Sequence, residues 1–405
     1  MTYECVSNRR VGRPEKSPHS RWPSTACLCL VALFAIAPPA LADKPRARDL
    51  GIPFNGTPGH NNAITDVVGV TVGFTTIIAD LPQGKAVRTG VTAILPRGRD
   101  TLDHPVFAGL FSLNGNGEMT GSHWVEESGF LEGPVMLTNT HSVGVVRDAT
   151  IAYRVKQGKP DASGYWWSLP VVAETWDGEL NDINGFHITP EHVTQAIDSA
   201  HDGPVAEGNV GGGTGMVCHE FKCGTGTSSR TATVDDHAYT VGALVQANYG
   251  VRSELRVAGV PVGQFLKDDL PGPISKDNGS IIIVLATDAP LLPQQLKRLA
   301  RRATMGLARN GSYSGNGSGD LFIAFSTANA EANQSTTVKN LTMLGNDQLD
   351  PLFLATADAV EEAIINAMIA AETMTGSDGY RAVAIDHQAL RALLKRYGRL
   401  LPTKN

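Results

Sequence analysis

The sequence has no excess of positive charge. Its 405 residues include 34 lysines and arginines against 40 aspartates and glutamates, for a net charge of −6, and both signs are spread along the chain. A protein that follows a phosphate backbone needs a basic stripe or patch, and the sequence contains neither. We therefore expect no nucleic-acid partner.

Long hydrophobic runs are also missing. The apolar stretch near the N-terminus, residues 26–37, is too short to span a bilayer, and two prolines at 38–39 end it. Five arginines and lysines precede it between positions 9 and 21, and the small-x-small sequence Ala-Leu-Ala follows at 40–42. This order is typical of an export signal, and a short membrane anchor or a buried helix is the alternative. We expect residues 1–42 to be a removable signal on an exported, periplasmic or secreted protein that keeps no stable membrane anchor.

Cysteine is scarce. Three of the five cysteines fall inside the expected signal, which leaves Cys218 and Cys223 with four residues between them. Two cysteines and the neighbouring His219 do not complete a zinc pattern. The pair therefore predicts a local disulfide or two free thiols, and we expect no metal.

The common hydrolase and nucleotide motifs are absent. None of the 11 histidines lies in a His-Glu-x-x-His sequence, and there is no Gly-x-Ser-x-Gly elbow. The glycine-rich segment 208–215 lacks both the Lys-Ser/Thr ending of a phosphate loop and the Gly-x-Gly-x-x-Gly spacing. We interpret it as backbone that approaches an active site or an interface closely, and we expect no cofactor.

The sequence does contain many short apolar runs separated by glycine-rich turns, with 43 glycines in all. Strand patterns lie at 67–72, 91–95, 106–113, 134–137, 240–246, 255–262, 281–286 and 321–326, and a further apolar run at 381–385. Helical patterns lie at 145–156, 190–201, 292–309 and 356–374, followed by a basic C-terminal helix. Nearly continuous apolar strands must be covered on both faces, so the pattern predicts a layered α+β or α/β body at 43–405.

One junction has two readings. Gly279-Ser280 follows an Asn and precedes the apolar run 281–286, and the polar segment 267–278 before it is typical of an exposed loop. The local sequence favours a tight turn, because Asn-Gly readily adopts positive φ. Alternatively, the Ser280 hydroxyl attacks the Gly279 carbonyl in an N-to-O acyl shift that water resolves.

Cleavage there would give Ser280 its own base. A free α-amino group has a pKa of about 7.7–8.0, so part of it is neutral near neutral pH and can accept the proton of the adjacent hydroxyl. A catalytic histidine would then be unnecessary.

Several separated segments resemble one family. The sequence is similar to the L-aminopeptidase/D-esterase-amidase family, also called β-peptidyl aminopeptidases or DmpA-like hydrolases, in segments 56–59, 61–66, 113–121, 137–144, 172–175, 207–211, 279–280, 286–290, 318–320 and 371–376. The resemblance implies a four-layer αββα sandwich of the DmpA/ornithine-acetyltransferase type. It also implies self-cleavage between Gly279 and Ser280 into chains 43–279 and 280–405.

The resemblance also implies site residues. Ser280 matches the nucleophile, Ser318 a second serine that supports it, and Asp320 an acidic residue beside that serine. Asn248 matches an oxyanion-hole donor, a role that suits a side-chain amide. Without the resemblance, 315–320 would be an ordinary turn and Asn248 the end of a strand.

Two further positions would bind substrate. Glu174 matches an acid that holds the ammonium group of the substrate's first residue, although alone it could be a solvated surface charge. Trp176 stands where relatives carry a tyrosine, and an indole offers one N–H donor and no hydroxyl, so we expect a different pocket shape.

The expected function is removal of N-terminal residues from small peptides, amides or esters, including β-amino acid or D-residue substrates, by a homo-oligomer of cleaved chains. One alternative is an acyltransferase resembling ornithine acetyltransferases, which use threonine as nucleophile. The other is a non-catalytic scaffold that keeps the fold and does not cut itself.

Overall fold

A computed structural model of the chain describes residues 44–99, 104–157, 167–268, 279–333 and 337–402. The expected export signal at 1–42 and the part of the expected loop at 269–278 lie outside the described residues. Among the helices that are described, none has the length and apolar character needed to cross a membrane.

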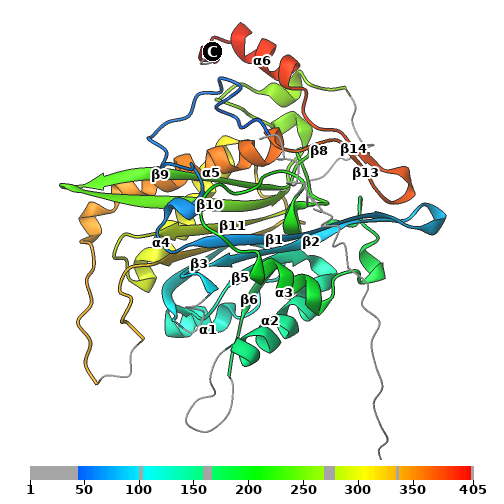
Figure 1. Cartoon of the computed structure of the whole chain (residues 1–405). Helices are drawn as coiled ribbons and strands as arrows, with labels where there is room; N and C mark the ends of the chain where they lie inside the picture. Colours follow the sequence, from blue (N-terminus) through cyan, green and yellow to red (C-terminus); the bar gives the residue numbers. More distant parts are fainter. Residues whose placement is uncertain (1–43, 100–103, 158–166, 269–278, 334–336, 403–405) are drawn as a thin grey trace, which may run out of the picture. The chain divides into compact units, whose positions relative to one another are not determined.

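Two β-sheets form the centre of the body at Lys44–Asn405 (Figure 1). The four-stranded sheet contains, in spatial order, β1 (Thr71–Asp80), β2 (Ala86–Leu95), β5 (Val135–Asn139) and β6 (Val171–Thr175). The six-stranded sheet contains β4 (Phe130–Leu131), β3 (Val106–Gly115), β12 (Gly319–Ser326), β11 (Ser280–Thr287), β10 (His237–Asn248) and β9 (Thr225–Val234).

Helices cover the outer face of each sheet. The four-stranded sheet packs against α2 (Val143–Gln157) and α3 (Pro190–Asp198), and the six-stranded sheet against α4 (Pro293–Arg309) and α5 (Asp350–Ile369). The remaining described elements include α1 (Ser122–Ser128), α6 (His387–Arg396) and the small hairpins β7 (Val217–Cys218) with β8 (Phe221–Lys222) and β13 (Met374–Thr375) with β14 (Arg381–Ala382). The expected αββα sandwich is confirmed.

The position of β11 between two cores explains why its sequence is apolar without interruption. Ile281 and Ile283 belong to the core between the six-stranded sheet and its helices. Ile282 and Val284 belong to the core between the two sheets. Since successive side chains of a strand point to opposite faces, a strand covered on both sides must be apolar at every position.

The predicted strand at 255–262 is wrong. Ala258 and Gly259 both have positive φ, 50° and 78°, and the only pairing there is a single bridge between Val257 and Val260. The segment is a tight loop whose apolar side chains are buried, and burial alone produced the strand-like pattern.

Two predicted elements have other bounds in the structure, and one strand was not predicted. Strand β1 begins at Thr71 because Gly69 has a φ of 92° and turns the chain, so the prediction at 67–72 was largely wrong. Helix α5 ends at Ile369, several residues before the predicted end at 374. Strand β9 was missed because its serines and threonines, although mostly buried, carry no apolar period.

Candidate active site

Sheet register brings three distant segments to one edge. Ser280 is the first residue of β11, and in the antiparallel pairing with β10 it lies opposite Asn248, the last residue of that strand. On the other side β11 runs parallel to β12, where Ile281 pairs with Asp320. The expected nucleophile therefore lies between the expected oxyanion donor and the expected Ser-Asp pair.

The hydroxyl of Ser280 is held by main chain. Its Oγ accepts a hydrogen bond from the Gly319 N–H at 3.0 Å. Beside Gly319 in sequence, Ser318 Oγ donates to Asp320 Oδ1 at 2.6 Å, and all these side chains are buried. Residues 315–318 do form a turn, but Gly319 begins β12, so this turn also positions a polar cluster at the Ser280 hydroxyl.

Gly279 has no space for a side chain. A Cβ atom placed there would lie 1.9 Å from the Asn248 carbonyl oxygen and 2.7 Å from Tyr249 Cα. Only glycine allows the backbone before Ser280 to approach the end of β10 so closely. The Asn278 side of the expected turn lies outside the described residues.

The Asn248 amide has a fixed orientation. Its Oδ1 accepts from the Val217 N–H at 2.9 Å, and its Nδ2 donates to the Trp176 carbonyl at 2.8 Å. An amide nitrogen carries a second N–H, and Asn248 lines the cavity described below. The arrangement suits donation to an oxyanion at Ser280.

Glu174 is the last residue but one of β6 and lies inside the protein. Only 4% of it is exposed, so the reading as a solvated surface charge is wrong. Its Oε1 accepts from the Glu118 N–H at 2.9 Å, and the Thr140 hydroxyl donates to its Oε2. Burial raises the pKa of the Glu174 carboxyl above its usual value, against the lowering effect of the bonds from Thr140 and Glu118.

These residues surround one cavity of about 800 Å³, which Gly279, Ser280 and Trp176 also line. Its walls carry four carboxylates, from Glu118, Glu174, Glu179 and Glu220. Lysine, arginine and histidine do not occur among the described residues that line it. Such a cavity has a negative potential and attracts the positively charged end of a ligand.

Several of these groups were missed from the sequence. Thr140 and Glu118 fall in segments that carry the family resemblance, but nothing local marks them as partners of Glu174. Glu179 and Glu220 come from separate loops and meet only in the folded cavity. Trp176 lines the cavity as expected, and its carbonyl in addition holds Asn248.

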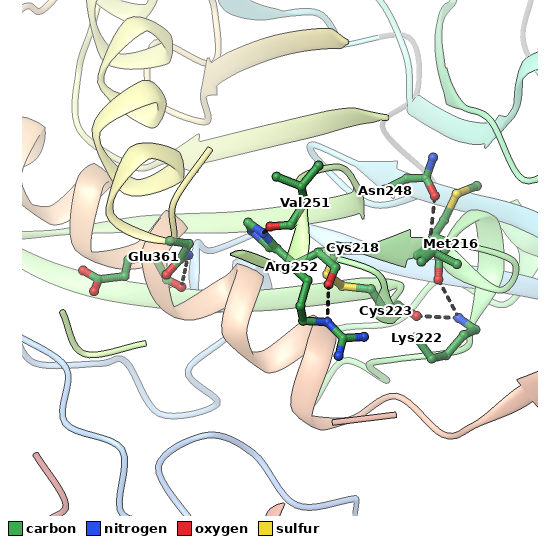
Figure 2. Close-up of a disulfide and its surroundings, with 11 residues drawn as sticks. Met216, Cys218, Lys222, Cys223, Asn248, Val251, Arg252 and Glu361 are labelled. Carbon is green, nitrogen blue, oxygen red and sulfur yellow. Dashed lines mark hydrogen bonds between the residues drawn. A yellow bond between two sulfur atoms is a disulfide. The ribbon is translucent and has the colours of Figure 1, made fainter. Parts of the chain in front are cut away.

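A disulfide lies beside this wall. Cys218 and Cys223 are bonded to each other, which confirms the first of the two predicted states (Figure 2). The bridge closes the β7–β8 hairpin, which carries Val217 and Glu220 into the cavity wall.

An αββα sandwich with a buried serine at the start of a central strand defines the class of N-terminal-nucleophile hydrolases. The model of peptidase family S58 matches residues 62–382, and the chain belongs to this family. It is an aminopeptidase of the N-terminal-nucleophile type.

Relatives agree over nearly the whole length. Beta-peptidyl aminopeptidase BapA of Sphingosinicella microcystinivorans is 52% identical over 393 residues, or 93% of this chain and 98% of the relative. The solved L-aminopeptidase D-Ala-esterase/amidase of Ochrobactrum anthropi, a variant of the Ntn hydrolase fold, has a TM-score of 0.82 and 52% identity over 88% of this chain and 100% of its own. The beta-aminopeptidase of a Burkholderia species has a TM-score of 0.80 and 49% identity over 87% and 99% of the two chains.

Proposed function

We propose that this aminopeptidase is exported, cuts itself between Gly279 and Ser280 into chains 43–279 and 280–405, and then uses Ser280 to release N-terminal residues from small peptides, amides and esters. The observation that carries the proposal is the position of the Gly279–Ser280 bond, which lies in an acidic cavity opposite the Asn248 amide. The names of the relatives support β-amino acid and D-residue substrates as part of the range.

The first step is self-cleavage. Ser280 Oγ attacks the Gly279 carbonyl carbon, the C–N bond breaks, and an ester joins Gly279 to Oγ while the α-amine of Ser280 is released. Water then hydrolyses the ester, which leaves a carboxylate on Gly279 and restores the hydroxyl of Ser280. The Gly319 N–H, which donates to Oγ at 3.0 Å, orients the attacking atom.

Turnover uses the new amine. In its neutral form it accepts the Oγ proton while Oγ attacks the substrate carbonyl, and the Asn248 amide donates to the oxyanion that forms. The amine then returns the proton to the leaving group, and water releases the acyl group by the reverse sequence. Ser318, oriented by Asp320 at 2.6 Å, supports the proton transfers next to Ser280.

Specificity for an amino end comes from charge. Glu174 is buried, accepts two hydrogen bonds and still lines the cavity, so its carboxylate can pair with a substrate ammonium at short range. Pairing also offsets the burial that raises its pKa, since a neighbouring positive charge favours the ionised form. Trp176 lines the cavity with an indole at a position where the family resemblance implies that relatives often carry a tyrosine.

Replacing Ser280 with alanine tests the proposal. The Ser280→Ala variant has neither the hydroxyl for the acyl shift nor a nucleophile, so we expect one uncut chain without hydrolytic activity. Mass spectrometry of the wild type should find fragments that end at Gly279 and begin at Ser280. Cleavage of the variant at the same bond would contradict the assignment.

The same experiments separate the alternatives. An intact wild-type chain without activity would favour a scaffold that keeps the fold, and transfer of an acyl group to an amine acceptor in place of water would favour an acyltransferase. Hydrolysis of α-, β- and D-aminoacyl amides, compared at equal concentration, defines the range. N-terminal sequencing of the secreted protein tests export and the signal boundary, and gel filtration tests the homo-oligomer inferred from the family resemblance.

A further inference from the structure

Lys222 places an ionisable amino group in the interior, where no carboxylate among the described residues is recorded as its partner. It is fully buried at the end of β8, and its ammonium donates to two main-chain carbonyls, those of Met216 at 2.9 Å and Cys223 at 2.5 Å. Burial lowers the pKa of Lys222 well below its usual value. A buried charge of this kind is costly, and an apolar residue of the same volume would avoid the cost.

The carbonyl that Lys222 binds belongs to an important peptide unit. The Met216 carbonyl accepts from Lys222 Nζ and from the Cys223 N–H at 3.0 Å. The N–H of the same peptide unit is that of Val217, and it donates to Asn248 Oδ1 at 2.9 Å. In Figure 2, Asn248 and Lys222 accordingly lie on opposite sides of Met216.

The contacts form a continuous chain of hydrogen bonds. It runs from the Lys222 ammonium through the Met216–Val217 peptide unit to the Asn248 amide, whose nitrogen faces Trp176 and the cavity. Each donation increases the polarity of the next amide group, because hydrogen bonds in a series strengthen one another at low dielectric. The Lys222 donor at one end of this series therefore makes the Asn248 N–H groups better donors.

The hairpin around this chain is held from several sides. The disulfide joins Cys218 to Cys223, whose carbonyl also binds Lys222. Arg252 Nε and Nη2 donate to the carbonyls of His219 and Glu220 at 2.9 and 2.6 Å. These two turn residues have positive φ values of 49° and 61°, a conformation that non-glycine residues keep only where the surroundings fix it.

We propose that Lys222 is a positioning residue for Asn248: through the Met216–Val217 peptide unit it orients and polarises the amide that donates to the oxyanion. The inference rests on the proposed function, because it assumes that role for Asn248. Lys222 does not touch the substrate, since it is fully buried and does not line the cavity. The disulfide keeps the peptide unit between the two side chains in place.

Two substitutions test the inference. Lys222→Met keeps the length of the side chain and removes its donors, and Lys222→Gln keeps a neutral donor. We expect kcat to fall about tenfold for Lys222→Met and less for Lys222→Gln, a part of the 10²–10³-fold effect of one oxyanion donor. KM should stay within about twofold, because oxyanion donors act mainly in the transition state. Rates are taken per mole of chains that begin at Ser280, since self-cleavage can also slow.

A matched control separates positioning from general destabilisation. Val193→Ala removes buried apolar volume in α3, in a core cluster that contains no residue of the hairpin, and should lower the melting temperature without lowering kcat. A Lys222→Met kcat within twofold of the wild type would overturn the inference. So would an equal loss of kcat in Val193→Ala. If Lys222→Met does not fold, Lys222→Gln decides by the same criteria.

A measurement that needs no turnover keeps this inference separate from the proposed function. In the Ser280→Ala background, hydrogen exchange of the Val217 amide should be faster with Lys222→Met than with Lys222, because the peptide unit loses its anchor. An unchanged exchange rate of the Val217 amide would overturn the inference, even if the protein with Ser280 is an active aminopeptidase. If wild-type protein hydrolyses no aminoacyl amide, the proposed function fails, and the exchange rate still decides whether Lys222 fixes Val217.

Discussion

Glu174 places a carboxyl group where charge is costly, and its proposed role in binding the amino end depends on that burial. Water cannot solvate a carboxylate that is 4% exposed, so its ionised form depends on Thr140, on the Glu118 N–H and on any cation that enters the cavity. A substrate ammonium would gain from this arrangement much more than at a solvent-exposed carboxylate.

Replacing Glu174 with glutamine measures that gain. Glu174→Gln keeps the size and one accepting oxygen, which can still accept from the Glu118 N–H, while the Thr140 hydroxyl can rotate to accept from the new amide. It removes the charge, so the transition-state binding of substrates with a free amino end, measured by kcat/KM, should weaken by about 1–3 kcal/mol. N-acetylated ester substrates serve as the control, because they carry no ammonium. An equal loss for both substrates would show that Glu174 does not bind the amino end.

Asp177 makes stability depend on pH. It is completely buried three residues after Glu174, and burial raises its pKa to about 7, against the lowering effect of bonds from Thr89 and Asn181. The unfolded chain releases this proton near pH ~3.9, whereas the folded chain keeps it up to about pH 7. The folded state therefore binds more protons in this window, and stability falls as the pH rises from about 4 to about 7.

An Asp177→Asn variant should lose this dependence. Asparagine has the shape of the protonated acid and does not ionise, so the variant should be more stable than wild type at pH 8, by on the order of 1–3 kcal/mol. The difference should shrink toward pH 4. Urea unfolding at several pH values checks both points, and a constant difference at every pH would show that Asp177 does not titrate in this window.

The sequence could point to some of these residues and not to others. Ser280 follows glycine and opens an apolar strand, but these local features favour a tight turn, and the family resemblance was needed to point to a nucleophile. The partners of Glu174 and the meeting of Glu179 with Glu220 depend on loops that are distant in the chain, and no local pattern records such contacts. The hydrogen bond from Val217 to Asn248 is donated by a main-chain N–H, which every residue except proline carries, so the identity of residue 217 does not predict it.

At the scale of elements, the β7–β8 hairpin brings Glu220, one of the four acidic side chains, to the cavity wall. Burial raises the pKa of Glu220, and the charge of Glu179 raises it further. The hairpin lies at the Asn248 side of Ser280, whereas Glu174 lies near Gly117 and Gly319 on the other side. The cavity thus has acidic side chains on both sides of Ser280.

We therefore expect faster cleavage of substrates with a second positive charge. The ratio of kcat/KM for lysyl- over norleucyl-p-nitroanilide tests a charge on the acyl side, and alanyl-lysine over alanyl-norleucine tests the leaving group. If Glu220 binds the second charge, Glu220→Gln should lower the ratio for the side of the substrate that carries this charge. We expect a decrease of about three- to tenfold, on the order of 1 kcal/mol. The exposed Glu331→Gln variant is the control for net charge. Ratios that Glu220→Gln leaves unchanged would contradict the expectation.

Elements with a strong period were predictable, and elements shaped by tertiary contacts were not. The β11–α4–β12 unit was expected within a few residues, because a fully buried strand, an amphipathic helix and a second buried strand each have a clear pattern. The apolar loop at 255–262 imitated a strand, and the hydroxyl-rich β9 concealed one. In the loop the apolar residues are buried without being paired as a strand, and in β9 most of the buried residues are not apolar, so apolar periodicity failed in both cases.

At the scale of the whole molecule, self-cleavage would leave two chains that cannot separate easily. Strands β11 and β12 of the smaller chain lie between β10 and β3 of the larger chain in one sheet. Their helices α4 and α5 then cover strands from both chains. Separation would break two ladders of hydrogen bonds and expose the core between sheet and helices, so the cut chains should remain one folding unit.

This interlocking predicts how the melting temperature depends on concentration. Unfolding of the cut protein releases two chains, so its melting temperature should rise with protein concentration by mass action. The uncut Ser280→Ala precursor unfolds to one chain, so its melting temperature should not depend on concentration for this reason. It also serves as the control for any concentration dependence that arises from homo-oligomers. Calorimetry of both forms over a hundredfold concentration range tests this. Equal slopes would show that the bond stays intact or that the chains separate before the sheet unfolds.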